Sequence, residues 1–296
     1  MHFSKERVGE LCILSESVLW GLFPVVTILT LASITPLVSL GWSVLFATGV
    51  FAILLTIRGT WKDVWNTAAL PDTLATAIIL GVVYYILFFI GLKYTSAGNA
   101  SIVALSEIFF NYCFFHLLRK EPMPAVHIAG AGLMLFGALL VLYPSLRAFQ
   151  LGDLLIVAAS CIAPLGNMFQ RRARTKVSSE SLLFVRTLIS TPIIFLLAYL
   201  LGTNPFLVHF EGSLWLILAL NGVFLLGLSK ILWIEGIHRI AVTKASALAS
   251  LAPLVTLLFA FILLHTSPTL FQLAAFIPMF FGVVLLGVHG KGSRLP

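Results

Sequence analysis

The chain has 296 residues, of which 60% are hydrophobic and only 10% are charged, and its mean hydropathy is +1.07. A soluble domain carries about 25% charged residues, so this composition excludes a water-soluble protein and predicts that lipid surrounds most of the side chains. The net charge of +7 does not indicate nucleic-acid binding, because the basic residues lie between hydrophobic segments and form no soluble basic domain.

Hydrophobic segments long enough to cross a bilayer, which takes about 20 residues in a helix, follow one another along the chain. They are expected near residues 10–31, 36–57, 73–92, 98–118, 125–143, 153–170, 181–201, 213–234, 244–264 and 270–288. Internal residues such as Gly21, Pro24 and Pro253 are tolerated, because neighbouring membrane helices satisfy the freed backbone groups. The sequence therefore predicts an all-α integral membrane protein with ten transmembrane helices.

Lys and Arg residues gather on one side of this arrangement. With a cytoplasmic N-terminus, fourteen of them fall in inside segments and only Lys93 and Arg147 fall in outside loops, while Arg186 and Lys230 lie within spans. The positive-inside rule then places both termini in the cytoplasm. We expect the protein in a plasma membrane, specifically a bacterial inner membrane, with the lipid bilayer as a partner.

An internal repeat divides the chain into two parts. The stretch "GLKYTSAGNASIVALSEIFF" from Gly91 and the stretch "GIHRIAVTKASALASLAPLV" from Gly236 align so that Ser101 coincides with Ser246. The repeat unit is five spans, and because five is odd, the second copy must enter the membrane upside down. We expect two inverted five-helix repeats, residues 1–148 and 149–296, with a binding site where they meet.

The sequence resembles the EamA-like branch of the drug/metabolite transporter superfamily over about residues 10–288. The likeness is carried by "SVLWGLFPV" and "GLKYTSAGNAS" in the first half, and by "GDLLIVAASCIAPLGNMFQRRA", "SSESLLFVRTLIS" and "VTKASALASLAPLVTLLFAFIL" in the second. This resemblance implies a ten-helix exporter or facilitator of small organic metabolites, such as amino acids or drug-like compounds.

Glu107 is the strongest candidate for the binding cavity. It lies close to the middle of its span and shares a helix face with Asn111 one turn later and with Val103 one turn earlier. A carboxylate at this depth is expected to exchange protons or to bind an amine. The alternative is a neutral carboxylic acid that hydrogen-bonds Asn111 or a neighbouring helix.

Three further ionisable residues, Glu16, Arg186 and Lys230, lie about one and a half turns from the cytoplasmic ends of their spans. They are expected to form a charge cluster near the inner gate. Two interpretations stay open for this cluster. It is either a structural ion-pair network, with the two bases reaching toward the interface, or a site that recognises substrate charge or senses protons.

Other polar or aromatic residues within the spans are weaker candidates for the cavity. Small polar stripes serve helix packing more often than ligand binding, and aromatic side chains more often face lipid or the core. The candidates are Trp20, Trp42, Asn167, Asn221, Ser246 and Ser250.

The leading functional hypothesis is a secondary transporter that alternates between inward-open and outward-open states. The sequence holds no GxxxxGK[ST] motif for a nucleotide and no GxSxG or HExxH motif for an enzyme. We expect no cofactor and no metal, a small-molecule substrate, protons as the candidate coupling ion, and a monomer or homodimer. A membrane channel and a non-transporting scaffold are the alternatives.

Overall fold

The computed structural model of the chain describes residues 4–119, 125–148, 150–206, 212–237, 239–240, 245 and 248–287. Every regular element within these residues is helical, so the all-α prediction is confirmed for the described part of the chain.

The elements of the first half begin with α1 (Lys5–Leu31), α2 (Pro36–Arg58) and a short 3₁₀ segment η1 (Trp61–Trp65), and continue as α3 (Leu70–Thr76), the π-helical η2 (Ala77–Tyr84), α4 (Tyr85–Lys93), α5 (Ala97–Ala104), α6 (Ser106–Arg119) and α7 (Ala125–Ala148). The second half comprises α8 (Leu151–Arg174), α9 (Ser179–Leu200), α10 (Gly212–Leu220), the π-helical η3 (Asn221–Leu228), α11 (Ser229–Ile237), α13 (Ala252–Leu264) and α14 (Leu270–Gly287).

The helix ends follow local sequence signals. The side chain of Ser4 accepts a hydrogen bond from the backbone N–H of Arg7 at 3.3 Å and caps the start of α1. Pro36 occupies the first turn of α2, where its missing N–H is not needed. Gly59 ends α2 with a φ of 67°, and its N–H bonds the carbonyl of Leu55.

Six described helical segments are long and apolar enough to cross a membrane. They are Lys5–Leu31, Pro36–Arg58, Leu70–Lys93, Leu151–Arg174, Ser179–Leu200 and Gly212–Ile237. Shorter apolar helices cover Ala125–Val141, Ala252–Leu264 and Leu270–Leu285. The expected span 98–118 is split into α5 and α6, and the expected span 244–264 includes residues that lie outside the described ones.

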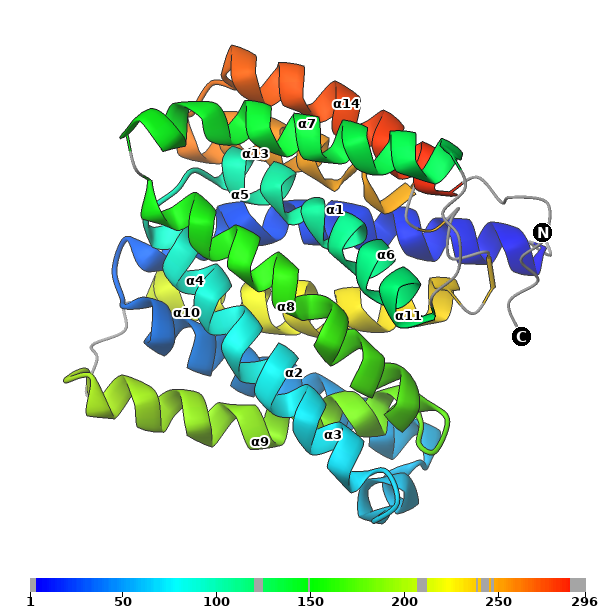
Figure 1. Cartoon of the computed structure of the whole chain (residues 1–296). Helices are drawn as coiled ribbons and strands as arrows, with labels where there is room; N and C mark the ends of the chain where they lie inside the picture. The colour runs from blue at the N-terminus through cyan, green and yellow to red at the C-terminus, as the bar shows by residue number, and fades with distance from the viewer. Residues whose placement is uncertain are drawn as a thin grey trace.

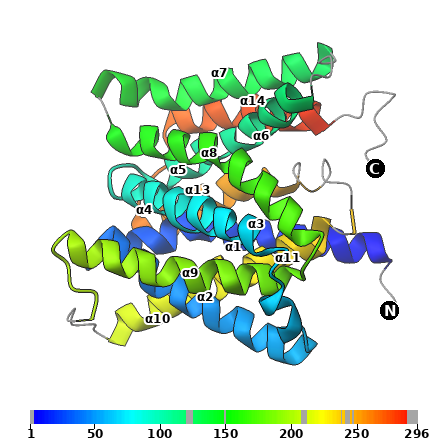
Figure 2. The same ribbon diagram turned by 60° about the horizontal axis from the view of Figure 1, so that its bottom comes forward.

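The helices lie side by side as one bundle (Figures 1 and 2). Helices α7 and α14 pack together along one edge, and α2 and α9 pack together along the opposite edge, with α1, α5 and α8 between these pairs. Helix α1 begins and α14 ends at the same end of the bundle.

The contacts between helices recur in corresponding positions of the two halves. Helix α1 packs on α11 and α13, while α8, the first helix of the second half, packs on α4 and α6. In the same way α2 packs on η3 and α9 packs on η2. Each half therefore holds its first two helices against the middle helices of the other half, while the last helices α7 and α14 pack on each other.

Glycines allow two of these helix pairs to approach with their backbones in contact. A Cβ atom added to Gly152 of α8 would lie 2.5 Å from the carbonyl oxygen of Gly91 in α4, closer than real Cβ contacts allow. A Cβ atom added to Gly222 of η3 would overlap the carbonyl oxygen of Ser43 in α2. Small residues at such crossings are typical of packed membrane helices.

The two π-helical segments also occupy corresponding places. The alignment that puts Gly91 on Gly236 puts Tyr85, which directly follows η2, on Lys230, which lies two residues after η3. π segments are rare in proteins as a whole, but those that occur are often found at functional sites.

Candidate functional site

The helix that carries Glu107 is interrupted just before this residue. Helix α5 ends at Ala104 and α6 begins at Ser106, and around the junction the N–H of Leu105 bonds the carbonyl of Ile102 at 3.1 Å. Glu107 thereby lies in the first turn of α6. The N-terminal turn of a helix carries partial positive charge, which favours a carboxylate at this position.

Glu107 joins side chains from three segments. Its Oε2 accepts a hydrogen bond from the hydroxyl of Tyr84 at 3.2 Å, and its Oε1 accepts one from the amide nitrogen of Asn167 in α8, also at 3.2 Å. The same Asn167 nitrogen lies 3.1 Å from Oδ1 of Asn111, whose own amide donates to the backbone carbonyl of Glu107 at 2.9 Å. We call Tyr84, Glu107, Asn111 and Asn167 the Glu107 cluster.

The Glu107 cluster brings together three residues that the sequence predicted for the cavity, Glu107, Asn111 and Asn167. All three are half-buried, while Tyr84 is buried. A half-buried carboxylate with two amides in the interior of an otherwise apolar bundle is the arrangement expected of a polar binding surface.

Lys230 extends this group of charges. Its Nζ lies 3.5 Å from the centre of the Trp20 ring, a close cation–π contact, and Trp20 in turn stacks on Phe23 with a ring separation of 4.8 Å. The ammonium interacts electrostatically with the carboxylates of both Glu16 and Glu107. Lys230 thus links the expected gate residue Glu16 to the Glu107 cluster.

Arg186 has different partners from the other two residues expected at the gate. This residue of α9 is 5% exposed, and its Nη1 donates to Oε1 of Gln170 in α8 at 3.1 Å. The guanidinium also interacts with Tyr85. Glu16 and Lys230 therefore form one group of the expected charge cluster, and Arg186 belongs to a second group with Gln170 and Tyr85.

The remaining candidates lie apart from these contacts. Trp42 donates from Nε1 to the carbonyl of Pro205 at 3.2 Å and packs edge-on against Trp215. Asn221 is fully buried and donates to Oγ1 of Thr27 at 3.1 Å. Ser250 is fully buried just before α13. Ser246, also expected in the cavity, lies outside the described residues.

Tyr84 and Tyr85 are not among the site residues predicted from the sequence. Their hydroxyl groups contact the two opposite charges, since Tyr84 bonds Glu107 and Tyr85 interacts with Arg186. The available signal was a pair of adjacent tyrosines in an otherwise apolar span, because a buried tyrosine hydroxyl requires a hydrogen-bond partner.

Polar networks also connect the two halves at the opposite ends of the bundle. At the start of α8 the fully buried Asp153 accepts hydrogen bonds from Thr95 and from Asn99, and Oδ1 of Asn99 accepts one from Gln272 of α14 at 2.7 Å. We call Thr95, Asn99, Asp153 and Gln272 the Asp153 network.

The other end, where α8 finishes, holds ion pairs. Arg58 of α2 lies 3.3 Å from Glu180 of α9 and 3.0 Å from Glu235 of α11, and Glu235 lies 2.6 Å from Arg239. The last residue of α8, Arg174, interacts electrostatically with Glu180 and Glu235. We call Arg58, Glu180, Glu235 and Arg239 the Arg58 network.

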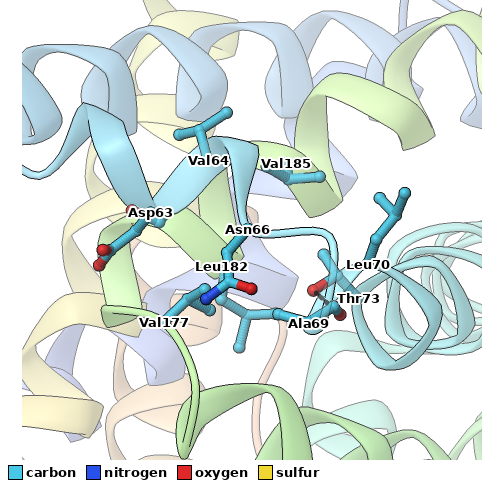
Figure 3. A pocket seen from close by; sticks show the side chains of 10 residues that line it. Asp63, Val64, Asn66, Ala69, Leu70, Thr73, Val177, Leu182 and Val185 are labelled. Atoms are coloured by element: carbon cyan, nitrogen blue, oxygen red, sulfur yellow. Dashed lines mark hydrogen bonds between the residues drawn. The ribbon is translucent and has the colours of Figure 1, made fainter.

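A small hollow near this second end is shown in Figure 3. It is lined by Asp63, Asn66 and Leu70 from one side and by Val177 and Leu182 from the other. Its volume of about 10 Å³ is at the lower limit for a single water molecule, so it does not accommodate an organic substrate.

The described residues contain no group of three or more His, Cys, Asp or Glu side chains that could hold a metal ion. The chemistry of the Glu107 cluster is instead that of hydrogen bonding and charge recognition.

Comparison with known proteins gives the family. A model of the EamA-like transporter family matches residues 7–143 and again residues 150–288. The uncharacterized transporter YyaM of Bacillus subtilis (strain 168) is 23% identical over 267 residues, which cover 86% of this chain and 85% of that protein. An uncharacterized transporter of Methanothermobacter thermautotrophicus is 27% identical over 226 residues, which cover 74% of this chain and 64% of that protein.

The fold is also found among solved structures. One crystal structure superposes with a TM-score of 0.69 at 19% sequence identity and covers 95% of this chain and 96% of its own. The family match spans both halves, the named relatives are transporters, and several described helices are apolar and long enough to span a bilayer. The chain therefore belongs to the EamA-like transporter family of the drug/metabolite transporter superfamily and is a transmembrane protein.

Proposed function

We propose that the protein is a secondary transporter that exports small organic metabolites, or facilitates their passage, by alternating access between its two halves. The observation that carries this proposal is the Glu107 cluster, in which Glu107 and Asn111 of the first half meet Asn167 of the second half beside an interrupted helix. A polar site at the junction of two halves, next to broken helices, is the arrangement on which many secondary transporters rely.

The two halves, residues 1–148 and 149–296, are proposed to be inverted five-helix repeats that together make ten membrane spans. The family match in each half, the corresponding helix contacts and the corresponding π segments all support this interpretation. An inverted pair of repeats has two nearly equivalent states, because each half can adopt the conformation that the other holds.

The Asp153 network and the Arg58 network are proposed as the two gates. Each joins residues of the first half to residues of the second half, and they lie at opposite ends of α8. Opening on one side requires that one network break while the other stays formed. With both termini on the cytoplasmic side, the Arg58 network is the inner gate and the Asp153 network the outer gate.

The remaining features of the proposal follow from the charge distribution. The excess of Lys and Arg in inside segments supports cytoplasmic termini in a bacterial inner membrane. Protons are the proposed coupling ion, with Glu107 as the proton carrier. Substrate flux that does not respond to an imposed pH gradient would instead indicate a facilitator without proton coupling. We propose no cofactor and no catalytic activity, and a monomer or homodimer as the working unit.

The test is a ligand screen followed by a flux measurement. Purified protein is heated with amino acids, nucleosides, vitamins and cationic drugs, because a ligand that binds only the folded state raises the melting temperature. Compounds that stabilise the protein are then followed in proteoliposomes. Alternating access predicts flux that saturates with concentration and is accelerated by the same compound on the opposite side. Flux that rises without saturation would indicate a channel, and stabilising compounds that never cross the membrane would indicate a scaffold.

A further inference from the structure

We propose that Arg186 forms an anion-binding subsite and that the transported compound carries a carboxylate which this guanidinium binds. This inference rests on the proposed transport function and adds the substrate class. The buried guanidinium of Arg186, which has no acidic partner among the described residues, carries it, rather than the Glu107 cluster itself.

Arg186 is nearly enclosed and only partly satisfied. Its exposure is 5%, its Nη1 donates to a neutral amide oxygen of Gln170 at 3.1 Å, and its Nε has no hydrogen-bond partner among the described residues. In the described part of the chain no carboxylate oxygen lies within 4.0 Å of the guanidinium, so the charge has no ion pair there.

Three acidic residues within or at the ends of the spans are engaged elsewhere. Glu16 and Glu107 interact with Lys230, and Glu180 pairs with Arg58. A buried charge without a counter-ion is strongly destabilising. A bound anion supplies the missing counter-charge.

The guanidinium is part of the same surface as the Glu107 cluster. Gln170 lies one helical turn after Asn167 on α8, so the two amides share a face. Tyr85 directly follows Tyr84 in the chain, and their rings are 5.2 Å apart. A ligand whose carboxylate meets Arg186 therefore lies beside the amide and hydroxyl groups that surround Glu107.

The position of Arg186 is supported by close packing. A Cβ atom added to Gly81 of η2 would lie 3.3 Å from Cγ of Arg186 and would overlap the hydroxyl of Ser190. The absence of a side chain at Gly81 lets the stem of the arginine lie against the π segment, which fixes the guanidinium next to Tyr85.

The neighbouring side chains indicate what else the ligand contains. Aromatic rings adjoin the cluster, with Phe88 5.9 Å from Tyr84 and 6.3 Å from Trp20. Arginine binds a carboxylate through two parallel hydrogen bonds, a geometry that lysine cannot reproduce. A compound with a single carboxylate on an apolar or aromatic body fits this site, whereas a phosphate brings a second negative charge that the single guanidinium of Arg186 does not neutralise.

Thermal stability with simple probes tests the subsite. The purified protein is melted with sodium propionate, benzoate and 3-phenylpropionate, with the matching neutral amides, and with sodium phosphate, all against sodium chloride at equal ionic strength. We expect at least one carboxylate to raise the melting temperature of the wild type above the value with its amide. Arg186→Gln should abolish this difference, whereas Arg172→Gln, which removes an exposed arginine of α8, should keep it.

Arg186→Lys provides a second measurement if Arg186→Gln does not fold. It retains the charge but loses the paired hydrogen bonds, so its affinity for the carboxylate should be about tenfold weaker. The proposal is overturned if no carboxylate exceeds its amide in the wild type, if phosphate stabilises more than every carboxylate, or if the carboxylate affinity is unchanged in both variants.

Flux measurements separate this inference from the proposed function. Carboxylate binding that requires Arg186, without any passage across proteoliposome membranes, supports the subsite and contradicts transport. Saturable flux of a neutral or cationic compound that is unchanged in Arg186→Gln supports transport and contradicts the subsite.

Discussion

Substitution of Glu107 by glutamine removes the charge of the central cluster and preserves its shape. In the wild type the carboxylate accepts hydrogen bonds from Tyr84 and Asn167, each 3.2 Å long. The glutamine side chain still accepts one of these bonds through its oxygen, and its nitrogen donates to the tyrosine oxygen. We expect a folded protein that has lost transport.

The stability change is small because two terms oppose each other. A hydrogen bond to a charged group contributes about 1.5–3 kcal/mol, against about 0.5–1.5 kcal/mol for a neutral one, so the two bonds lose about 2–3 kcal/mol together. The neutral amide in turn avoids the penalty of about 2.5–3.5 kcal/mol for a charge at the centre of a span. The net change in the free energy of unfolding is within about 1 kcal/mol, which corresponds to a melting-temperature shift of about 2–4 °C.

The effect on transport is larger because nothing compensates it. The glutamine amide takes up no proton, so proton transfer through residue 107 is lost. A ligand ammonium group bound there loses a charge-assisted hydrogen bond, worth about 1.5–3 kcal/mol, or about 10- to 150-fold in affinity. Uptake of a compound from the ligand screen into proteoliposomes measures this loss. Glu6→Gln, which neutralises an exposed carboxylate in the first turn of α1, is the matched control. Uptake by Glu107→Gln near the wild-type rate would refute the placement of the binding site.

The other predictions concern the surroundings of this cluster. Asn167→Ala removes the donor that holds both Glu107 and Asn111, so flux should fall by about tenfold, the equivalent of one hydrogen bond to a charged group, as measured in the same proteoliposomes. Gly152→Ala should lower the melting temperature by several degrees, because its Cβ would press on the backbone of α4. Gly132→Ala, where a Cβ meets no atom within 4 Å, should leave the melting temperature unchanged or raise it. Equal melting temperatures of the two variants would contradict the close helix crossing. Asp153→Asn should weaken the Asp153 network by about 1–2 kcal/mol, since its bonds become neutral, and a lower melting temperature than that of the wild type checks this expectation.

The class of fold was predictable from the sequence because the bilayer imposes it. Helix lengths and apolar composition follow from the thickness of the hydrocarbon region, and this made the long spans recognisable without any tertiary information. The interruption at Leu105 was not predicted, since it lies within a continuous apolar and small-residue run that carries no proline or other breaking signal at that point.

Helical spacing was enough to predict part of the grouping in the candidate site. Glu107 and Asn111 lie one turn apart on one helix, and Asn167 was selected as a polar residue within the span 153–170. The contact of Asn167 with Glu107 and Asn111 could not be predicted from the sequence, because it depends on how α8 crosses α6. The contacts of Trp42 with Trp215 and Pro205 were likewise not predictable, because the sequence does not reveal which side of a helix an aromatic side chain packs on.

The positions of Tyr84 and Tyr85 in the site were not predictable for a different reason. Face assignment along a span assumes a regular α-helix of 3.6 residues per turn. The π segment η2 ends directly at these tyrosines, so an α-helical count started at Leu70 assigns them to a different face from the one they occupy.

The two π segments, η2 and η3, are places where a change of helix type would turn the residues that follow. A π turn contains about one residue more than an α turn, so conversion of η2 to α geometry would rotate everything beyond it by about 100°. Tyr84 would then move away from Glu107 and Tyr85 away from Arg186 at the same time. The stretch from Leu70 to Thr76 would stay in place. Conversion of η3 would swing Lys230 off the Trp20 ring in the same way. Glu107, Arg186 and Lys230 would then lose their contacts with Tyr84, Tyr85 and Trp20 through the rotation of single helices, without the two halves separating.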